Sequence, residues 1–247
     1  MRKAIRFADT LINRIVAVIC LLLFLICLYA MIDAVNVYLN ANDTSVLKFK
    51  PKLGESQEPL REVVKDAVAW LTVDGTSIDH PVMQGKTNDT YINKDPYGNF
   101  SLSGSIFLDS RNSSDFSDEY SMIYGHHMEH GAMFGALDDF SDAAYFDRHR
   151  SGTLITSDGT GYSIAFFACC KAPANETVVF DPPESNNSDL LKYIEANAAI
   201  YYPDEVDTDS VILALSTCQS AETIERLVVF GVLTRLTAEE SNERSTK

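Results

Sequence analysis

One candidate nucleophile in the sequence is a cysteine at the end of an apolar stretch. Cys218 follows Leu213-Ala-Leu-Ser-Thr, so an expected strand over 211–215 brings its thiol to the place where the chain leaves a sheet. A thiolate attacks carbonyl carbon, but a free thiol has a pKa of about 8.5 and needs a base or a positive neighbour. Cys218 is therefore either a nucleophile or a buried structural cysteine, and its position alone leaves both open.

Two other strand ends carry side chains that complement a thiolate. His126 follows Ser121-Met-Ile-Tyr-Gly, and Arg226 opens the apolar stretch Leu-Val-Val-Phe-Gly. An imidazole can accept the thiol proton and later protonate a leaving amine. A guanidinium keeps its proton near neutral pH, but it can stabilise negative charge that develops on a carbonyl oxygen. Together the three residues would form an acyl-transfer site, although the spacing alone does not bring them together, and an arginine at a strand start is often only a solvated strand end.

A competing motif overlaps the histidine. His126, Glu129 and His130 fit the H-x-x-E-H pattern of some zinc peptidases. That pattern needs a helix that places both histidines on one face, one turn apart. Gly125 and Gly131 flank the segment and disfavour a helix, so we expect no metal here. His80, His127, His130 and His149 are expected to be surface or packing residues.

The elements that must position these residues are mostly short strands. Apolar runs separated by turn residues predict strands at 70–73, 104–108, 120–124, 152–157, 161–168, 210–216 and 226–234. A short amphipathic helix is expected over 58–70, with Pro59 in its first turn, and an interposed helix over 188–201. Many short strands with few helices are typical of a closed or nearly closed β-barrel.

The N-terminal region predicts attachment to a membrane. Residues 15–32 are 18 consecutive uncharged, mostly apolar residues, and a helix of that length spans roughly 27 Å, close to the hydrocarbon core of a bilayer. A cleaved signal peptide is the alternative, but the run is long and Tyr29-Ala-Met-Ile is a poor cleavage site. Because the basic residues precede the run, we expect 1–14 in the cytoplasm and the rest of the chain outside the cell.

The remaining chain is expected to comprise a polar stalk (33–57), a catalytic domain (58–237) and a disordered tail (238–247). The formal net charge is −15, and residues 1–14 carry four basic residues and one acidic residue. An acidic body argues against nucleic acid as a partner, because phosphate binding needs clustered Lys and Arg. Outside the apolar run the cysteines are odd in number. Cys169 and Cys170 are adjacent, and we expect them to be buried thiols rather than a strained disulfide.

Taken in order, these landmarks resemble the class B sortases of Gram-positive bacteria. The resemblance runs from about Leu60 to Leu236. It is carried by Trp70-Leu-Thr-Val-Asp-Gly-Thr-Ser-Ile-Asp-His-Pro-Val-Met-Gln84, Asn88-Asp-Thr-Tyr-Ile92, Ser103-Gly-Ser-Ile-Phe-Leu-Asp-Ser-Arg-Asn112, Tyr124-Gly-His-His-Met128, Leu215-Ser-Thr-Cys218 and Arg226. Two positions depart from the usual family pattern: His127 stands where asparagine is common, and Ala214 where threonine is common.

The resemblance implies a sortase-like closed β-barrel and a transpeptidase with Cys218, His126 and Arg226 in its active site. The implied substrate is a secreted protein with a C-terminal sorting signal of the Asn-Pro-x-Thr type, and the implied acceptor is an amine on a cell-wall peptide. The resemblance also suggests Asn88, Ile92 and Ser216 as substrate-groove residues. No metal or organic cofactor is needed for this chemistry. A hydrolytic membrane-anchored cysteine protease, a zinc peptidase and a non-enzymatic adhesion module remain as alternatives.

Overall fold

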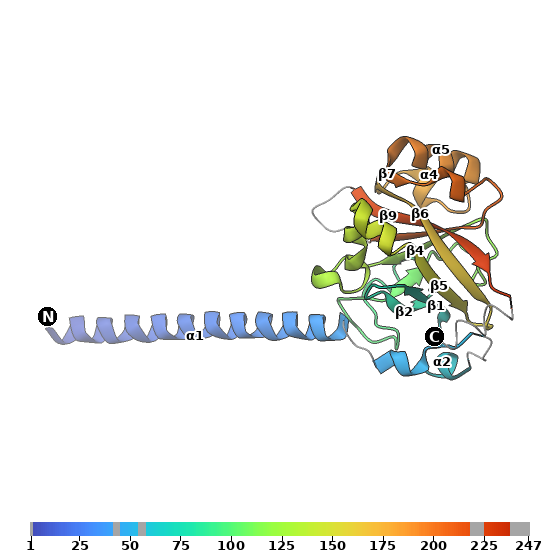
Figure 1. Ribbon diagram of the computed structural model, residues 1–247. Helices are drawn as coiled ribbons and strands as arrows, with labels where there is room; N and C mark the ends of the chain where they lie inside the picture. Colours follow the sequence, from blue (N-terminus) through green and yellow to red (C-terminus); the bar gives the residue numbers. More distant parts are fainter. Residues whose placement is uncertain (1, 42–44, 54–57, 218–224, 238–247) are drawn as a thin grey trace. The chain divides into compact units, whose positions relative to one another are not determined.

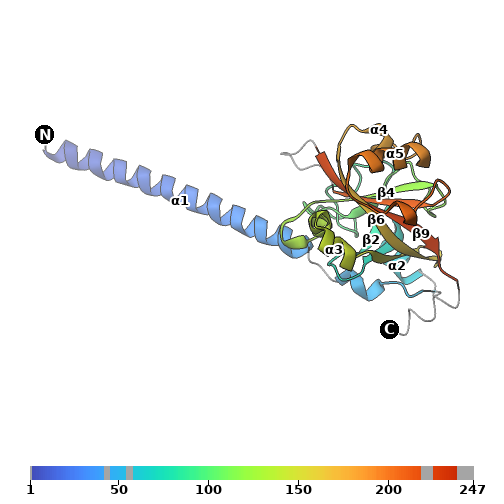
Figure 2. The same ribbon diagram turned by 45° about the horizontal axis from the view of Figure 1, so that its top comes forward.

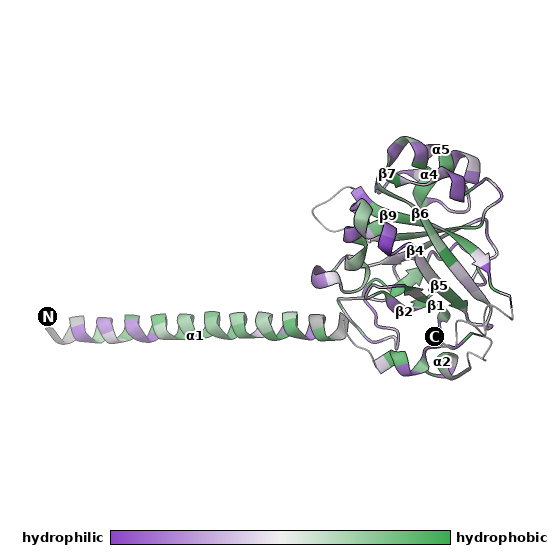
Figure 3. Cartoon of the chain, viewed as in Figure 1, coloured by the Kyte–Doolittle hydropathy of each residue, from purple (hydrophilic) through white to green (hydrophobic). Residues whose placement is uncertain are grey.

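The computed structural model describes residues 2–41, 45–53, 58–217 and 225–237 (Figure 1). The chain divides into two compact units, residues 1–40 and residues 41–247. The first unit is almost entirely the helix α1 (Arg2–Ala41). Its segment Asp9–Val37 is long enough to cross a membrane, and the most apolar 18-residue window within it has a mean hydropathy of 3.2. Figure 3 shows the apolar residues as a green stretch along the helix. The apolar run expected over 15–32 lies within this segment.

The second unit is a β-barrel. Its strands are β1 (Ala67–Val73), β2 (Asp79–Met83), β3 (Ile106–Leu108), β4 (Tyr120–Gly125), β5 (Ser151–Thr156), β6 (Gly161–Pro173), β7 (Ala198–Tyr201), β8 (Ile212–Thr217) and β9 (Glu225–Arg235). The order in the sheet is β5-β1-β2-β3-β4-β8-β9-β6-β7, and a further pairing of β5 with β6 closes the ring. Eight strands thus form the barrel, and β7 extends it at β6. The expected mainly β, closed-barrel fold is confirmed.

Short helices cover the barrel and close one opening (Figures 1 and 2). They are α2 (Glu58–Val63), α3 (Ala143–Arg148), α4 (Thr177–Phe180) and α5 (Asn187–Asn197), with the 3₁₀ turns η1 (Ser45–Phe49), η2 (Glu129–Gly131), η3 (Phe134–Ser141) and η4 (Pro203–Glu205). In both views α4 and α5 lie next to each other at one end of the barrel, beside β6 and β7.

Two of the expected helices are too long, and two strands were not expected. The helix expected over 58–70 ends at Val63, and Ala67–Val73 instead pairs with β2 and β5. The helix expected over 188–201 ends at Asn197, after which Ala198–Tyr201 adds to the edge of β6. In both cases pairing with a neighbouring strand overrides a helical sequence pattern. The strand β2 escaped prediction because it contains Pro81, which pairs with Trp70 in the sheet.

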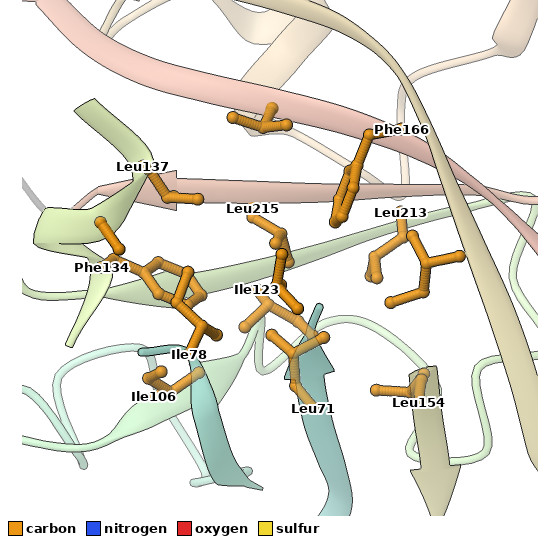
Figure 4. Packing of buried hydrophobic residues seen from close by; sticks show 14 of the residues in the cluster. Leu71, Ile78, Ile106, Ile123, Phe134, Leu137, Leu154, Phe166, Leu213 and Leu215 are labelled. Carbon is orange, nitrogen blue, oxygen red and sulfur yellow. The ribbon is translucent and has the colours of Figure 1, made fainter. Parts of the chain in front are cut away.

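The strands β4 and β8 are buried on both faces. Alternate residues of β4 and β8 point inward, where Ile123, Leu213 and Leu215 meet residues of the other strands and Phe134 and Leu137 of η3 (Figure 4). The intervening residues point outward into a second apolar cluster, which includes Met122, Ala214 and residues of α4 and α5. Six consecutive buried residues in each of these two strands therefore reflect a filled barrel under an outer layer of helices.

The segment just before α2 packs on the barrel. Val46 of η1 is buried in the outer cluster, and Lys50 Nζ donates to Asp79 of β2 at 2.9 Å. Asp79 also accepts hydrogen bonds from Trp70 Nε1 at 2.7 Å and from Thr72. The sequence analysis places residues 45–53 in a stalk because of their polar surroundings, whereas the structure makes them part of the compact unit.

Candidate functional site

The strands β4 and β8, each followed in the sequence by a predicted site residue, end side by side. They are parallel neighbours in register, and their last pair is Gly125 with Thr217. His126 is the next residue after Gly125, and Cys218 is the next residue after Thr217. Cys218 lies outside the described residues. In β4 the even-numbered residues belong to the outer cluster, so the alternation of side chains gives His126 the outer face of the barrel.

The imidazole of His126 is held by the backbone of a neighbouring loop. Its Nε2 lies 2.6 Å from the carbonyl oxygen of Ile92. Because a carbonyl oxygen can only accept, Nε2 carries the hydrogen, and Nδ1 is the nitrogen that exchanges a proton when the ring is neutral. The contact thus selects the tautomer and the orientation of the ring.

Close packing against Gly104 supports this geometry. Gly104 has a φ of +60°, and a Cβ there would lie 2.3 Å from the Ile92 carbonyl oxygen and 2.9 Å from Cδ2 of His126. A side chain would displace the carbonyl that orients the imidazole. Gly104 is therefore required both for its backbone conformation and for the space that it leaves.

The guanidinium of Arg226 lies between two aromatic rings. Its Cζ is 5.1 Å from the ring centroid of Phe180 and 6.0 Å from that of Tyr124. Both rings can stabilise a cation through their faces. The Nε atom of Arg226 is buried, and no residue in the described ranges accepts a hydrogen bond from it. Buried donors are rarely left without an acceptor, so this atom is suited to binding a ligand oxygen.

A buried carboxylate fixes the residues around Arg226. Asp109 is fully buried and accepts hydrogen bonds from Asn88 Nδ2 at 2.9 Å, from Tyr124 Oη at 3.2 Å and from three nitrogens of Arg111. Burial raises the pKa of Asp109, but the hydrogen bonds from Arg111 and Asn88 outweigh it and leave the pKa below its usual value. Arg111 also donates to the carbonyl of Phe180.

This arrangement links Asp109 to both rings that contact the Arg226 guanidinium. Burial and the charge of Asp109 raise the pKa of Tyr124, so its hydroxyl stays protonated and keeps donating to the carboxylate. The sequence analysis did not single out Asp109, Arg111, Tyr124 or Phe180 as site residues. The first three lie within the motifs that carry the resemblance, but nothing in the sequence pattern distinguishes Phe180.

The three residues predicted to line a substrate groove occupy different environments. The side chain of Asn88 is half-buried and bonds to Asp109 and to the backbone nitrogen of Ser110. Ile92 is half-buried, and its carbonyl binds His126. Ser216 is fully buried, and its hydroxyl contacts the carbonyl of Thr217. Their contact with a substrate remains a prediction. Asn88 and Ile92 also have a structural role, because they hydrogen-bond to Asp109 and His126.

The zinc motif does not take the form that zinc binding needs. Glu129 and His130 lie in a single 3₁₀ turn, and His130 has a φ of +59°, so His126 and His130 do not share a helix face. Among the described residues, no group of three or more His, Cys, Asp or Glu side chains could hold a metal ion. His127 is exposed and bonds to Asp138, and His149 stacks on Tyr145.

Comparison with known proteins agrees with this geometry. Residues 71–234 match the model of the sortase domain family. The chain is 30% identical to sortase B of Staphylococcus aureus over 72% of this chain and 75% of that protein. A crystal structure of a Streptococcus pyogenes class B sortase involved in pilus biogenesis superposes with a TM-score of 0.66 and 38% identity, covering 72% of this chain and 97% of that one.

A second solved structure, the Staphylococcus aureus sortase B–substrate complex, gives a TM-score of 0.67 at 29% identity and covers 73% of this chain and 85% of that one. The family match spans most of the barrel from β1 to β9. The chain therefore belongs to the sortase family, and within it to the class B sortases, which are cell-wall sorting transpeptidases.

Proposed function

We propose that Cys218 is the nucleophile of this transpeptidase, His126 its proton-transfer residue and Arg226 its oxyanion-binding residue. The strand register carries the proposal. The parallel register of β4 and β8 ends at the pair Gly125 and Thr217, and continued by one residue it would pair His126 with position 218. The antiparallel register of β8 and β9 ends at the pair Ser216 and Val228, and continued by two residues it would pair position 218 with Arg226. Both registers support a site that contains these three residues.

The proposed substrate is a secreted protein with an Asn-Pro-x-Thr sorting signal. The thiolate of Cys218 attacks the carbonyl carbon of the threonine, and the developing oxyanion accepts hydrogen bonds from Arg226. The C–N bond breaks, the protonated Nδ1 of His126 gives its proton to the leaving amine, and a thioester remains. An acceptor amine on a cell-wall peptide then attacks the thioester, loses a proton to His126 and releases the thiolate.

The structure supports these roles for His126 and Arg226 in different ways. The Ile92 carbonyl orients the imidazole so that Nδ1 exchanges the proton. The buried Nε of Arg226 without a partner in the described ranges matches the need for an oxyanion donor. The basic residues at the start of α1, Arg2, Lys3, Arg6 and Arg14, favour a cytoplasmic N-terminus. The barrel then works outside the cell, where secreted substrates and the wall are found.

The test uses the full chain in detergent, a quenched-fluorescent peptide containing Asn-Pro-Gln-Thr and an amine acceptor, with the products identified by mass. We expect a peptide–amine conjugate from the wild type and none from Cys218→Ala or His126→Ala. Cys170→Ala and His127→Ala are matched controls, because they remove a cysteine and a histidine at other positions, and both should retain activity. An active Cys218→Ala variant would eliminate the proposal, whereas cysteine-dependent hydrolysis without conjugate would favour a protease.

Pilin polymerisation is a second candidate function. The Streptococcus pyogenes enzyme involved in pilus biogenesis is 38% identical to this chain, against 29% for the Staphylococcus aureus sortase B in its substrate complex. In that case the acceptor would be an amine of another pilus protein, for which a lysine-containing peptide is the probe. Competition between a lysine-containing peptide and a wall-type peptide for one thioester pool distinguishes the two acceptors.

A further inference from the structure

A hairpin beside the active site presents apolar side chains to solvent. Residues 94–100 form a tight turn, closed by the bridge between Lys94 and Phe100 and by the hydrogen bond from Asp95 N to Asn99 O at 2.9 Å. Phe100 is 75% exposed, and Leu102 is 47% exposed. The alternate residues Ser101 and Ser103 are buried and share a hydrogen bond, so the side chains of Phe100 and Leu102 are the exposed ones of this segment.

The same hairpin contacts the segment that follows the membrane helix. Tyr97, at the turn, shares a hydrogen bond of 3.1 Å with Ser45, the first residue of η1. Leu47 of η1 is also partly exposed. These four residues, Leu47, Tyr97, Phe100 and Leu102, are called the apolar edge below. They are the exposed large apolar residues of residues 45–53 and 94–104.

Covalent reach limits how far the apolar edge lies from the bilayer. The candidate membrane span of α1 ends at Val37, and the helix continues to Ala41, about 6 Å further along its axis. From Ala41 to Ser45 there are four peptide units, which extend at most about 14 Å. The polar headgroup zone on each side of a bilayer is itself roughly 5–8 Å thick. Ser45 therefore lies at most about 20 Å from the end of the candidate span, so Ser45 and the hairpin bonded to it can reach the lipid surface.

The charge next to the apolar edge fits a lipid surface better than it fits another copy of this chain. Residues 45–53 contain Lys48, Lys50 and Lys52 and no acidic residue, although the whole chain has 35 acidic against 20 basic residues. Lys48 and Lys52 are exposed, and Lys50 pairs with Asp79. Basic side chains beside exposed aromatic and aliphatic residues are typical of surfaces that lie on anionic lipids.

We propose that the apolar edge and the adjacent lysines form a membrane-contact surface that rests on anionic phospholipid, with Phe100 inserted among the headgroups. The loop that carries this surface begins just after Ile92, whose carbonyl orients His126. Contact with lipid would therefore hold the loop next to the Ile92 carbonyl, which orients His126, at the bilayer surface. That consequence rests on the proposed function, but the contact itself does not.

The experiment places a tryptophan in the contact surface. The chain has a single tryptophan, Trp70, which is fully buried in the outer cluster. Phe100→Trp adds a fluorescent side chain at the apolar edge. The full-length variant is reconstituted at one protein per nanodisc that contains phosphatidylglycerol. The matched control is Glu195→Trp, on the exposed face of α5. The unmodified chain supplies the Trp70 background.

Brominated acyl chains should remove ~half or more of the emission added at position 100, because interfacial side chains lie about 5–10 Å into the headgroup and acyl boundary. Emission added at position 195 should be unaffected by bromine and quenched by aqueous iodide. If bromine has the same effect at both positions, the proposal is overturned. Protection of position 100 from both quenchers would also overturn it, because protein rather than lipid would then cover the edge.

The outcome is independent of catalysis. The quenching measurement needs no substrate, so it can fail while the transpeptidase assay succeeds, and the reverse can also occur. Phe100→Ser combined with Leu102→Ser provides a functional arm. This variant should keep the wild-type rate on a soluble signal peptide and lose ~tenfold in rate on the same signal anchored in the bilayer, a loss typical of a missing second attachment. An equal loss on both substrates would contradict a role for lipid contact in catalysis.

Discussion

Replacing Asp109 by asparagine tests whether the buried carboxylate holds the site together. The substitution keeps the shape of the side chain but turns one acceptor oxygen into an NH₂ group. If the amide nitrogen takes the place of Oδ2, it faces three donors: Asn88 Nδ2, Arg111 Nη2 and Tyr124 Oη. Lost hydrogen bonds cost about 1 kcal/mol each, and more when one partner is charged. We expect the free energy of unfolding to fall by about 3 kcal/mol.

The decrease in the free energy of unfolding should be smaller than it would be if the substitution left a buried charge without any partner. Arg111 is 41% exposed, and it also pairs with Asp181 at 2.6 Å. Its guanidinium therefore keeps a partner when Asp109 is neutralised. For a domain of about 200 residues, a loss of about 3 kcal/mol corresponds to a decrease in Tm of ~6–12 °C. Glu119→Gln, an exposed change near the start of β4, is the control and should alter stability by less than about 0.5 kcal/mol.

The pH dependence gives a second, sharper readout. The pKa of Asp109 is lower in the folded protein than its usual value. Its stabilising contribution is therefore complete above a pH of about 4, and it disappears as the pH falls through the lowered folded pKa. Urea unfolding from pH 7 to pH 3 should show the gap between wild type and Asp109→Asn narrowing at the acidic end. A gap that stays constant over this range, or a gap near zero at pH 7, would refute the assigned role.

Three further predictions follow from the same structure. Gly104→Ala should lower kcat/KM at least ~10-fold, because a Cβ displaces the Ile92 carbonyl. The control Gly98→Ala has a similar positive φ but no atom within 4 Å of its Cβ, so it should cost only about 1–2 kcal/mol of stability. Equal effects of the two substitutions on kcat/KM would argue against the carbonyl contact. The fragment 41–247 should melt at a higher temperature than 60–247, which lacks the packing of η1, and equal melting temperatures would show that this packing contributes nothing. Burial lowers the pKa of His80 from 6.5 to about 4, so the free energy of unfolding of the wild type should decline as the pH falls from 6.5 to 4. In chemical denaturation, His80→Gln should make that decline less steep. An equally steep decline in the variant would contradict the prediction.

The residues most visible in the sequence are those that end an apolar strand. His126 and Arg226 stand out because a charged or titratable side chain follows or opens a buried stretch, and Cys218 stands out in the same way. The supporting residues are less visible. Asp109 resembles an ordinary loop aspartate until β3 and β4 are known to be neighbours, and Phe180 reaches Arg226 only through the tertiary fold.

The two helices that were predicted too long have a common cause. In 58–70 and 188–201 the apolar spacing is compatible with a helix, but the last residues of each pair with a strand that lies elsewhere in the sequence, β5 in the first case and β6 in the second. Local patterns contain no information about that partner. The segment 45–53 is a similar case, because its lysines suggest a solvated linker, whereas Asp79 and the outer apolar cluster hold it against the barrel.

The order of strands in the barrel also has a consequence for synthesis. The barrel is complete only when β8 and β9 enter between β4 and β6, and these are the last two strands of the chain. While the ribosome is still making the C-terminal part, β4 and β6 each present an unpaired edge, and such edges favour aggregation. Long-range pairings of this kind also form slowly. A growing chain thus keeps these two edges open until β8 and β9 have been made, and the pairing of β4 with β8, which ends at Gly125 and Thr217, is among the last to form.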